Sequence, residues 1–198
     1  MLFYECAVVE KRKAEEELLD GIERGKKLST APSSLGNASD YIAVQKQKLL
    51  YNGYPKSLQP LPLVLYHPVF ANFVNDCETI DLEFDSHVMA TQFIEGMTDT
   101  YNIEDDRRDK FHKLCKDWLG FELVLGSISI LGKNYSTDGC IFQKNFVPVV
   151  LEVKNDNAGN AFKQACGYYW RFIQSLEEGY ARKTRLPCLL LCLTGQYR

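Results

Sequence analysis

The feature that most constrains the fold of this chain is the apolar segment 146–154 (FVPVVLEVK), followed by an amphipathic helix pattern and a second apolar segment. Near-continuous apolar runs are typical of strands covered on both faces. The pattern over residues 159–178 predicts a helix, and residues 186–193 predict another buried strand. A strand, a helix and a strand in this order form a crossover, so we predict that the two strands run parallel in one sheet.

Two further strands and two helices precede this unit. Residues 121–131 and 137–143 are β-prone, and Gly132-Lys133-Asn134 is a turn signal between them. A second turn at 144–145 leads into segment 146–154, which predicts an antiparallel pair. Helical patterns cover residues 88–101 and 104–118. The order helix, three strands, helix, strand predicts an α/β fold with a mixed central sheet flanked by helices.

The amino-terminal part is expected to be a separate helical and extended region, residues 1–70, joined to a domain at 71–198. It contains helix patterns at 5–28 and 40–52, and a Ser-, Pro-, Gly- and Asn-rich segment, 29–39, that reads as a linker. Residues 63–66 (LVLY), between prolines, predict a short strand or extended arm. The predicted domain 71–198 therefore carries an N-terminal helical extension.

The composition excludes several classes of protein. Of the 198 residues 45% are hydrophobic and the net charge is −3, which argues against a disordered chain. No apolar run approaches the ~20 residues of a membrane-spanning helix. The first residues resemble no signal peptide, and the seven cysteines include no C-x-x-C pair, so we expect an intracellular protein of the cytoplasm or nucleus with reduced thiols.

Three charged residues lie in or next to strand segments that are otherwise apolar and predicted to be buried. Glu152 and Lys154 are two apart on a strand and point to one face, while Asp138 lies on the neighbouring strand. Two carboxylates on adjacent strands, with a main-chain carbonyl, form a hard oxygen site for Mg²⁺. Lys154 would then orient or deprotonate an attacking water. The simpler alternative is a salt bridge at a sheet edge, with Asp138 serving only as a turn residue.

The helix after this strand carries a polar stripe of Gln164, Tyr168 and Arg171, at positions i, i+4 and i+7. Glutamine and tyrosine side chains can hold a carboxylate or a phosphate. In the alternative reading, Tyr168 packs in the core and Gln164 is solvated. The expected core face is the apolar stripe of this helix: Phe162, Tyr169, Phe172 or Ile173, and Leu176.

Together, Asp138, Glu152-x-Lys154 and Gln164-x-x-x-Tyr168 resemble the motifs of the PD-(D/E)xK, or restriction-endonuclease-like, nuclease superfamily. The Q-x-x-x-Y element is similar to its RecB and lambda-exonuclease branch, and the surrounding sequence resembles nuclease-like domains of crinkler-type proteins of fungi and oomycetes. The resemblance implies an αβββαβ core.

The resemblance also implies a mechanism and a set of site residues. Mg²⁺ (or Mn²⁺) would be bound by Asp138, Glu152 and the main-chain carbonyl of Val153. Lys154 would assist the attack of water on a DNA phosphodiester, and Gln164 and Tyr168 would position the metal site or the scissile phosphate. The family usually adds an acid from the first core helix. Three residues could supply it: Glu95, with Glu78 and Glu104 as rivals.

Three functions follow from these patterns. The first is a metal-dependent nuclease acting on DNA. The second is a catalytically weak or inactive nuclease-fold module that binds nucleic acid or protein beside a C-terminal kinase-like domain, in a longer effector-type protein that could be delivered into host cells. The third is a structural domain with an ion pair. The acidic net charge does not exclude DNA as a partner, because residues 163–185 carry five basic against two acidic side chains, whereas residues 76–109 carry eleven acidic against two basic.

Overall fold

The computed structural model describes residues 16, 19–27, 30–47, 63–65, 68–79, 81, 83–130, 132–143, 146–155, 159–176 and 188–195. The chain divides into two compact units. The first unit is Met1–Tyr51 together with Gly96–Arg198, and the second unit is Asn52–Glu95. The predicted turn at 144–145, and most of the predicted helix over 5–28, lie outside the described residues. In the described part, no helix has both the length and the apolar character needed to cross a membrane.

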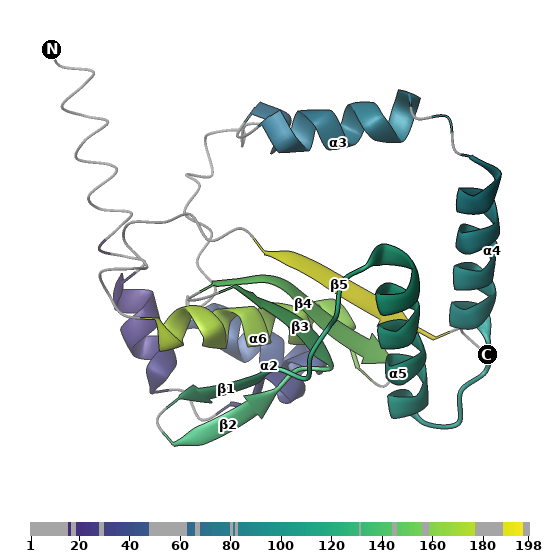
Figure 1. Ribbon diagram of the computed structural model, residues 1–198. Helices are drawn as coiled ribbons and strands as arrows, with labels where there is room; N and C mark the ends of the chain where they lie inside the picture. The colour runs from purple at the N-terminus through teal and green to yellow at the C-terminus, as the bar shows by residue number, and fades with distance from the viewer. Residues whose placement is uncertain are drawn as a thin grey trace, which may run out of the picture. The chain divides into compact units, whose positions relative to one another are not determined.

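The sheet of the first unit is small and mixed, with the strand order β3-β4-β5. Strand β4 (Phe146–Lys154) lies in the centre, antiparallel to β3 (Gly139–Gln143) and parallel to β5 (Leu189–Thr194). Four of its apolar side chains, Val147, Val150, Leu151 and Val153, are at most 1% exposed, as the sequence predicts for a central strand. The predicted α/β class, the hairpin into β4 and the parallel crossover are therefore confirmed (Figure 1).

The segment predicted as one strand over residues 121–131 is divided, which corrects the expectation that it forms the first of three continuous strands. Val124 forms a single bridge to Cys140, and β1 (Ser127–Ile130) then turns back into β2 (Lys133–Ser136) as a separate two-stranded sheet. The division has a steric reason at Gly126, where a Cβ atom would lie 2.3 Å from the Cys140 sulfur. The chain passes too close to β3 there for a side-chain-bearing strand to continue.

Helix α6 (Ala161–Ser175) connects β4 to β5 and packs on the sheet. Its core face differs from the predicted one, because Phe162 is 56% exposed while Ala165, Tyr168 and Phe172 join the core cluster with Val147 and Val150. The buried face of α6 also contains polar side chains: Gln164, Arg171 and Gln174. The prediction that α6 buries Phe162 is therefore wrong, and the stripe that was expected to be polar is largely the buried one.

The Pro- and Ser-rich segment is not a linker. Residues Pro32–Gly36 form a 3-10 helix, η1, whose Pro32 and Leu35 are buried against α6. Gly167 makes this approach possible, since a Cβ atom there would lie 2.5 Å from Cδ1 of Leu35. Arg171 completes the attachment by donating to the carbonyls of Gly25 and Thr30. The amino-terminal residues thus belong to the first unit, and the compact units do not follow the predicted boundary at residue 70.

Helix α5 (Glu104–Leu114), which contacts β4, ends the way the sequence predicts. It continues as a π-helical turn, η3 (Cys115–Leu119), and stops at Gly120, which has a φ of 68°. Helix α2 (Ala38–Lys46) begins two residues before its predicted start. The six cysteines of the described part are free thiols, in agreement with the expectation of a reduced protein.

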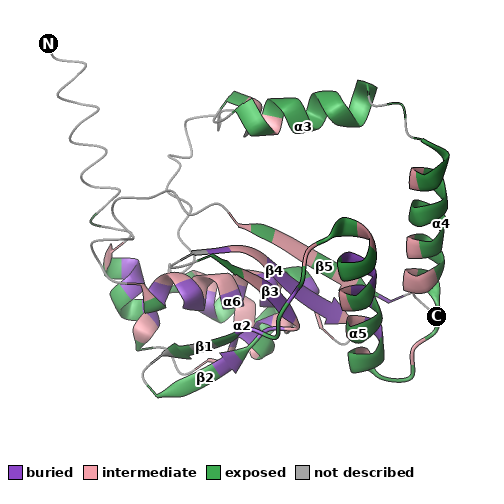
Figure 2. Ribbon diagram, in the orientation of Figure 1, coloured by how far each residue is buried: buried purple, intermediate pink, exposed green. Residues whose placement is uncertain are grey.

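The second unit is helical and bears little buried surface. It contains a 3-10 turn, η2 (Leu63–Leu65), the helix α3 (Pro68–Thr79) and most of α4 (Phe84–Thr98). The predicted strand or extended arm at 63–66 is wrong over residues 63–65, and α3 was not anticipated. Neither α3 nor α4 has a buried residue, whereas burial in the first unit follows β4 and α6 (Figure 2).

Candidate functional site

The end of β4 brings together the charged residues that the sequence singled out. The side chains of Glu152 and Lys154 lie on one face of β4, with Nζ of Lys154 3.0 Å from Oε1 of Glu152. Glu104, the first residue of α5, contributes an acid from another element, with its Oε1 2.8 Å from the same Nζ. With Asp138 these residues form the charged cluster: Glu104, Asp138, Glu152 and Lys154.

Asp138 is held at this site by the backbone of β4. It directly precedes β3, and the pairing of Gly139 with Leu151 places it beside Glu152 in the same register. Its Oδ2 accepts a hydrogen bond of 2.8 Å from the Val153 amide. The carboxylate thus accepts the hydrogen bond that a backbone carbonyl of a longer β3 would accept from β4. A role as a turn residue alone does not account for this position.

Glu152 is the least solvated acid of the charged cluster. Only 3% of the residue is exposed, and its Oε2 is buried with no hydrogen-bond partner in the described part of the chain. Burial first, and the negative charge of Asp138 second, raise the pKa of Glu152 to about 7, in spite of the opposing effect of Lys154. A buried carboxylate with a vacant acceptor is costly unless it binds something, which favours a functional reading over a structural ion pair.

Lys154 remains a cation in this environment. Burial lowers the pKa of its ammonium, but the hydrogen bond that it donates to Glu104 and the negative charge of Glu152 outweigh burial, so the pKa stands above its ordinary value. Nζ also donates to the Val153 carbonyl at 2.7 Å. As a cation, Lys154 is therefore suited to stabilise a negative charge on a ligand rather than to accept a proton. This favours the first of its two predicted roles, orienting water, over deprotonating it.

Two of the three groups predicted to bind a metal, the Glu152 carboxylate and the Val153 carbonyl, contact the Lys154 ammonium, whereas Asp138 accepts from the Val153 amide. The carboxylates of Glu104 and Glu152 and the Val153 carbonyl all contact the Lys154 ammonium, and the Glu152 Oε2 is vacant. Hard oxygen donors of this kind suit Mg²⁺ or Mn²⁺. Within the described residues, no three Asp, Glu, His or Cys side chains are grouped so as to bind a metal by themselves, so a metal here would need the carbonyl and solvent as well.

Gln164 and Tyr168 both lie near the charged cluster, but in different settings. A Cβ atom at Gly159 would lie 3.0 Å from Nε2 of Gln164 and 3.6 Å from Cε of Lys154, so the amide and the lysine stem border the same glycine. Gln164 is buried, not solvated as the alternative reading supposed. Tyr168 packs in the core cluster, yet the charges of Glu152, Asp138 and Glu104 add to burial in raising the pKa of its hydroxyl.

Of the three acids that could complete the site, Glu104 is the one bonded within it. Glu78 and Glu95 belong to the second unit. The local sequence does not distinguish Glu104 from its rivals, because only the packing of α5 on β4 brings its side chain to Lys154. The predicted order of preference, with Glu95 first, could not take this packing into account.

Arg107 is a site-supporting residue that the sequence did not single out. It lies one turn after Glu104 on α5 and is 5% exposed. Its Nε donates to Oδ1 of Asn155 at 2.8 Å, and Nη1 donates to the Met97 carbonyl at 2.8 Å. The guanidinium also lies 4.8 Å above the Tyr101 ring. Because Asn155 follows Lys154, Arg107 fixes the distance between α5 and the end of β4.

Comparison of the chain with models of protein families, with curated proteins and with solved structures gave no match. The case for function therefore rests on the residues of the site and their geometry.

The stability of the protein should depend on pH through Glu152. Its pKa is about 7 in the folded chain, against an ordinary value of 4.5, so the folded state binds more protons between these values and stability falls as the pH rises through them. We expect Glu152→Gln to be more stable than the wild type at pH 8, by up to about 3 kcal/mol, with the difference vanishing near pH 4.5. Urea unfolding at both pH values measures this.

The matched control is Glu122→Gln, which changes an exposed acid paired with Lys116 at the surface. It should leave the free energy of unfolding nearly unchanged at both pH values. A Glu152→Gln chain that is no more stable than the wild type at pH 8 would show that Glu152 is not strained by its burial.

Proposed function

We propose that this chain is a metal-dependent phosphodiesterase that cleaves DNA, with a restriction-endonuclease-like core. The observation that carries the proposal is the charged cluster: the carboxylates of Glu104 and Glu152 contact the Lys154 ammonium, and Asp138, held by the Val153 amide, lies beside Glu152. The acids outnumber the base, and one of them, Glu152, is buried with a vacant oxygen. A structural ion pair needs one acid, whereas three acids beside one lysine, one of them buried, leave negative charge that a further cation could balance.

In this proposal Asp138, Glu152 and the Val153 carbonyl hold Mg²⁺ or Mn²⁺. When bound, such an ion polarises a phosphoryl oxygen and lowers the pKa of water. The chain's own residues supply the rest. Lys154, kept cationic by Glu104 and Glu152, orients the attacking water and offsets negative charge on the phosphate. The Gln164 amide, beside the lysine stem at Gly159, positions the phosphate, and Tyr168 supports α6 against the sheet as part of the core.

The test is cleavage of plasmid DNA by the purified chain. We expect nicked and linear products with Mg²⁺ or Mn²⁺ and none in EDTA, and we expect Glu152→Ala to remove the activity. Glu122→Ala, which alters an exposed acid paired with Lys116, is the matched control and should cleave like the wild type. Metal-independent cleavage, or equal activity of Glu152→Ala, would contradict the proposal.

A second function is favoured by the contacts that Lys154 makes within the charged cluster. The Lys154 ammonium contacts two carboxylates and a carbonyl without any metal, so the cluster is also compatible with a nuclease fold kept as a binding module for nucleic acid or protein beside a kinase-like domain. This alternative predicts that the chain binds an oligonucleotide equally well in Mg²⁺ and in EDTA and cleaves it in neither.

A further inference from the structure

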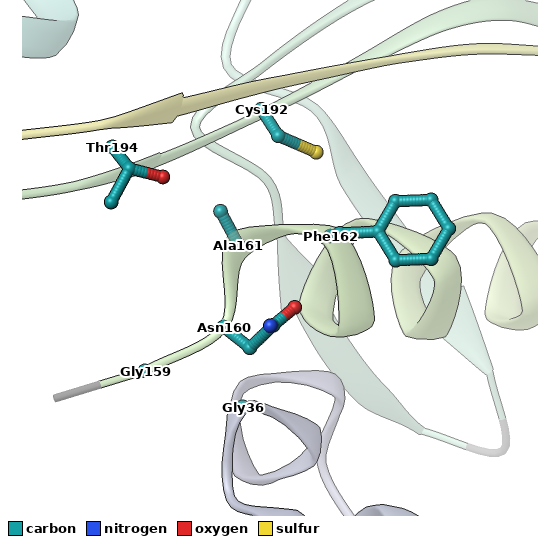
Figure 3. Close-up of a pocket in the computed structure, with 7 residues that line it drawn as sticks. All are labelled: Gly36, Gly159, Asn160, Ala161, Phe162, Cys192 and Thr194. Atoms are coloured by element: carbon teal, nitrogen blue, oxygen red, sulfur yellow. The ribbon is translucent and has the colours of Figure 1, made fainter. Parts of the chain in front are cut away.

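A pocket of about 270 Å³ lies beside the charged cluster. It is formed by Gly36 at the end of η1, the first turn of α6 with its preceding residues, and Cys192 and Thr194 on β5. Figure 3 shows the Cys192 and Thr194 side chains on the side of β5 that faces α6, with the Phe162 ring at one side. None of the lining residues carries a charge, so the pocket lining contains no acidic side chain that would repel a polyanion.

The register of the sheet connects this pocket to the site. In the parallel pair of β4 and β5, Glu152 is opposite Cys192 and Lys154 is opposite Thr194. Side chains at paired positions point to the same face, so the pocket wall continues the face that carries the acid and the lysine. The charge of Glu152 adds to burial in raising the pKa of the Cys192 thiol, which agrees with this proximity. Gly159, which also lines the pocket, borders Gln164 and Lys154.

The pocket has an aromatic side chain on its rim. Phe162 is 56% exposed although it begins a helix whose other large apolar side chains pack inward. The next residue, Lys163, holds its ammonium 5.0 Å above the Tyr41 ring. An exposed aromatic ring with a cation nearby, next to a pocket that adjoins a phosphate-cleaving centre, is the arrangement on which single-stranded bases stack.

We propose that this pocket holds the nucleotide next to the scissile phosphate of a single DNA strand, with its base stacked on Phe162. The inference rests on the proposed function and names its substrate class. A base that is paired inside a duplex cannot stack on a protein ring without leaving the helix. The preferred substrate is therefore single-stranded DNA or a frayed end, rather than intact duplex.

The first experiment measures binding by fluorescence anisotropy, using a labelled eight-nucleotide single strand and the Glu152→Gln chain, so that the strand stays intact. Adding Phe162→Ala should weaken binding about tenfold, since one stacked base is lost. The matched control is Phe142→Ala, which removes a 45% exposed ring from β3, outside the pocket, and should change the Kd less than about twofold. A blunt hairpin duplex should bind more weakly than the single strand.

The second experiment reads the pocket directly through the Cys192 thiol. Alkylation of the Glu152→Gln chain by N-ethylmaleimide is followed by peptide mass spectrometry. At ten times the Kd the single strand should slow modification of Cys192 about tenfold. Cys77, an exposed thiol on α3, is the internal control and should react at the same rate with and without DNA.

Three results would overturn the inference: equal affinity of the Phe162→Ala and Phe142→Ala chains, an unprotected Cys192 while the strand is bound, or no binding of the strand. Tighter binding of the duplex would overturn the substrate class. The outcomes separate the two proposals. A wild-type chain that cleaves DNA without protection of Cys192 refutes the pocket alone. A chain that protects Cys192 yet never cleaves refutes the phosphodiesterase alone.

Discussion

Replacing Lys154 by methionine is expected to reduce DNA cleavage at least about a hundredfold, because the variant loses the ammonium that, in the proposed mechanism, orients the water and offsets negative charge on the phosphate. The protein should also lose stability. Lys154 is the partner of both Glu104 and Glu152, so its removal leaves two carboxylates beside Asp138 without an opposing charge. Breaking a buried pair in this way costs about 3 kcal/mol or more at pH 8. Plasmid cleavage and urea unfolding at pH 8 measure the two effects.

A second substitution tests whether the loss of stability comes from the unpaired buried charge of Glu152. In the double variant Lys154→Met/Glu152→Gln the buried charge is gone, so stability should recover most of the loss while cleavage stays absent. Lys116→Met is the matched control, because Lys116 is a lysine paired with Glu122 on the exposed surface, and such a pair contributes at most about 1 kcal/mol. Cleavage that returns together with stability in the double variant would contradict the proposed roles of both Lys154 and Glu152.

The sequence predicted the part of the site that depends on local periodicity. Glu152 and Lys154 share a face because strand side chains alternate, and Asp138 reaches them because a short hairpin sets the register of β3 on β4. The third acid required knowledge of tertiary packing. Glu104 lies 48 residues before Glu152, and only the docking of α5 on β4 brings it to Lys154. Nothing in the local pattern ranks it above other acids in an acidic segment.

Two of the wrong fold predictions, those for α6 and η1, share one physical cause: the apolar pattern does not say what covers an element. In α6 the expected core face contained Phe162, but η1 covers the opposite side near Gly167, so Gln164 and Arg171 became buried. The Ser- and Pro-rich composition of η1 reads as a linker, yet two buried apolar residues are enough to anchor it. Local composition predicts turns well, but it does not predict which turns pack.

Replacing Arg107 by alanine should destabilise the first unit by about 3–5 kcal/mol, since it removes a buried guanidinium and leaves its acceptors unsatisfied. These acceptors are the carbonyls of Met97 and Asp99 and Oδ1 of Asn155. Arg107→Lys should restore little of the lost stability, because a lysine ammonium lacks the planar guanidinium that donates to several acceptors at once. The measurements are urea unfolding and amide hydrogen exchange of peptides from 97–101 and around 155.

The comparison with Arg24→Ala makes this prediction specific. Arg24 pairs with Asp20 on an exposed helix surface, and its loss should cost less than about 1 kcal/mol. The two effects differ because Arg107 is 5% exposed and joins three segments of chain, whereas the side chains of Arg24 and Asp20 are both exposed. If Arg107→Ala unfolds no more readily than Arg24→Ala, the position of Glu104 beside Lys154 must be fixed by the packing of α5 alone, and the guanidinium is dispensable for assembling the site.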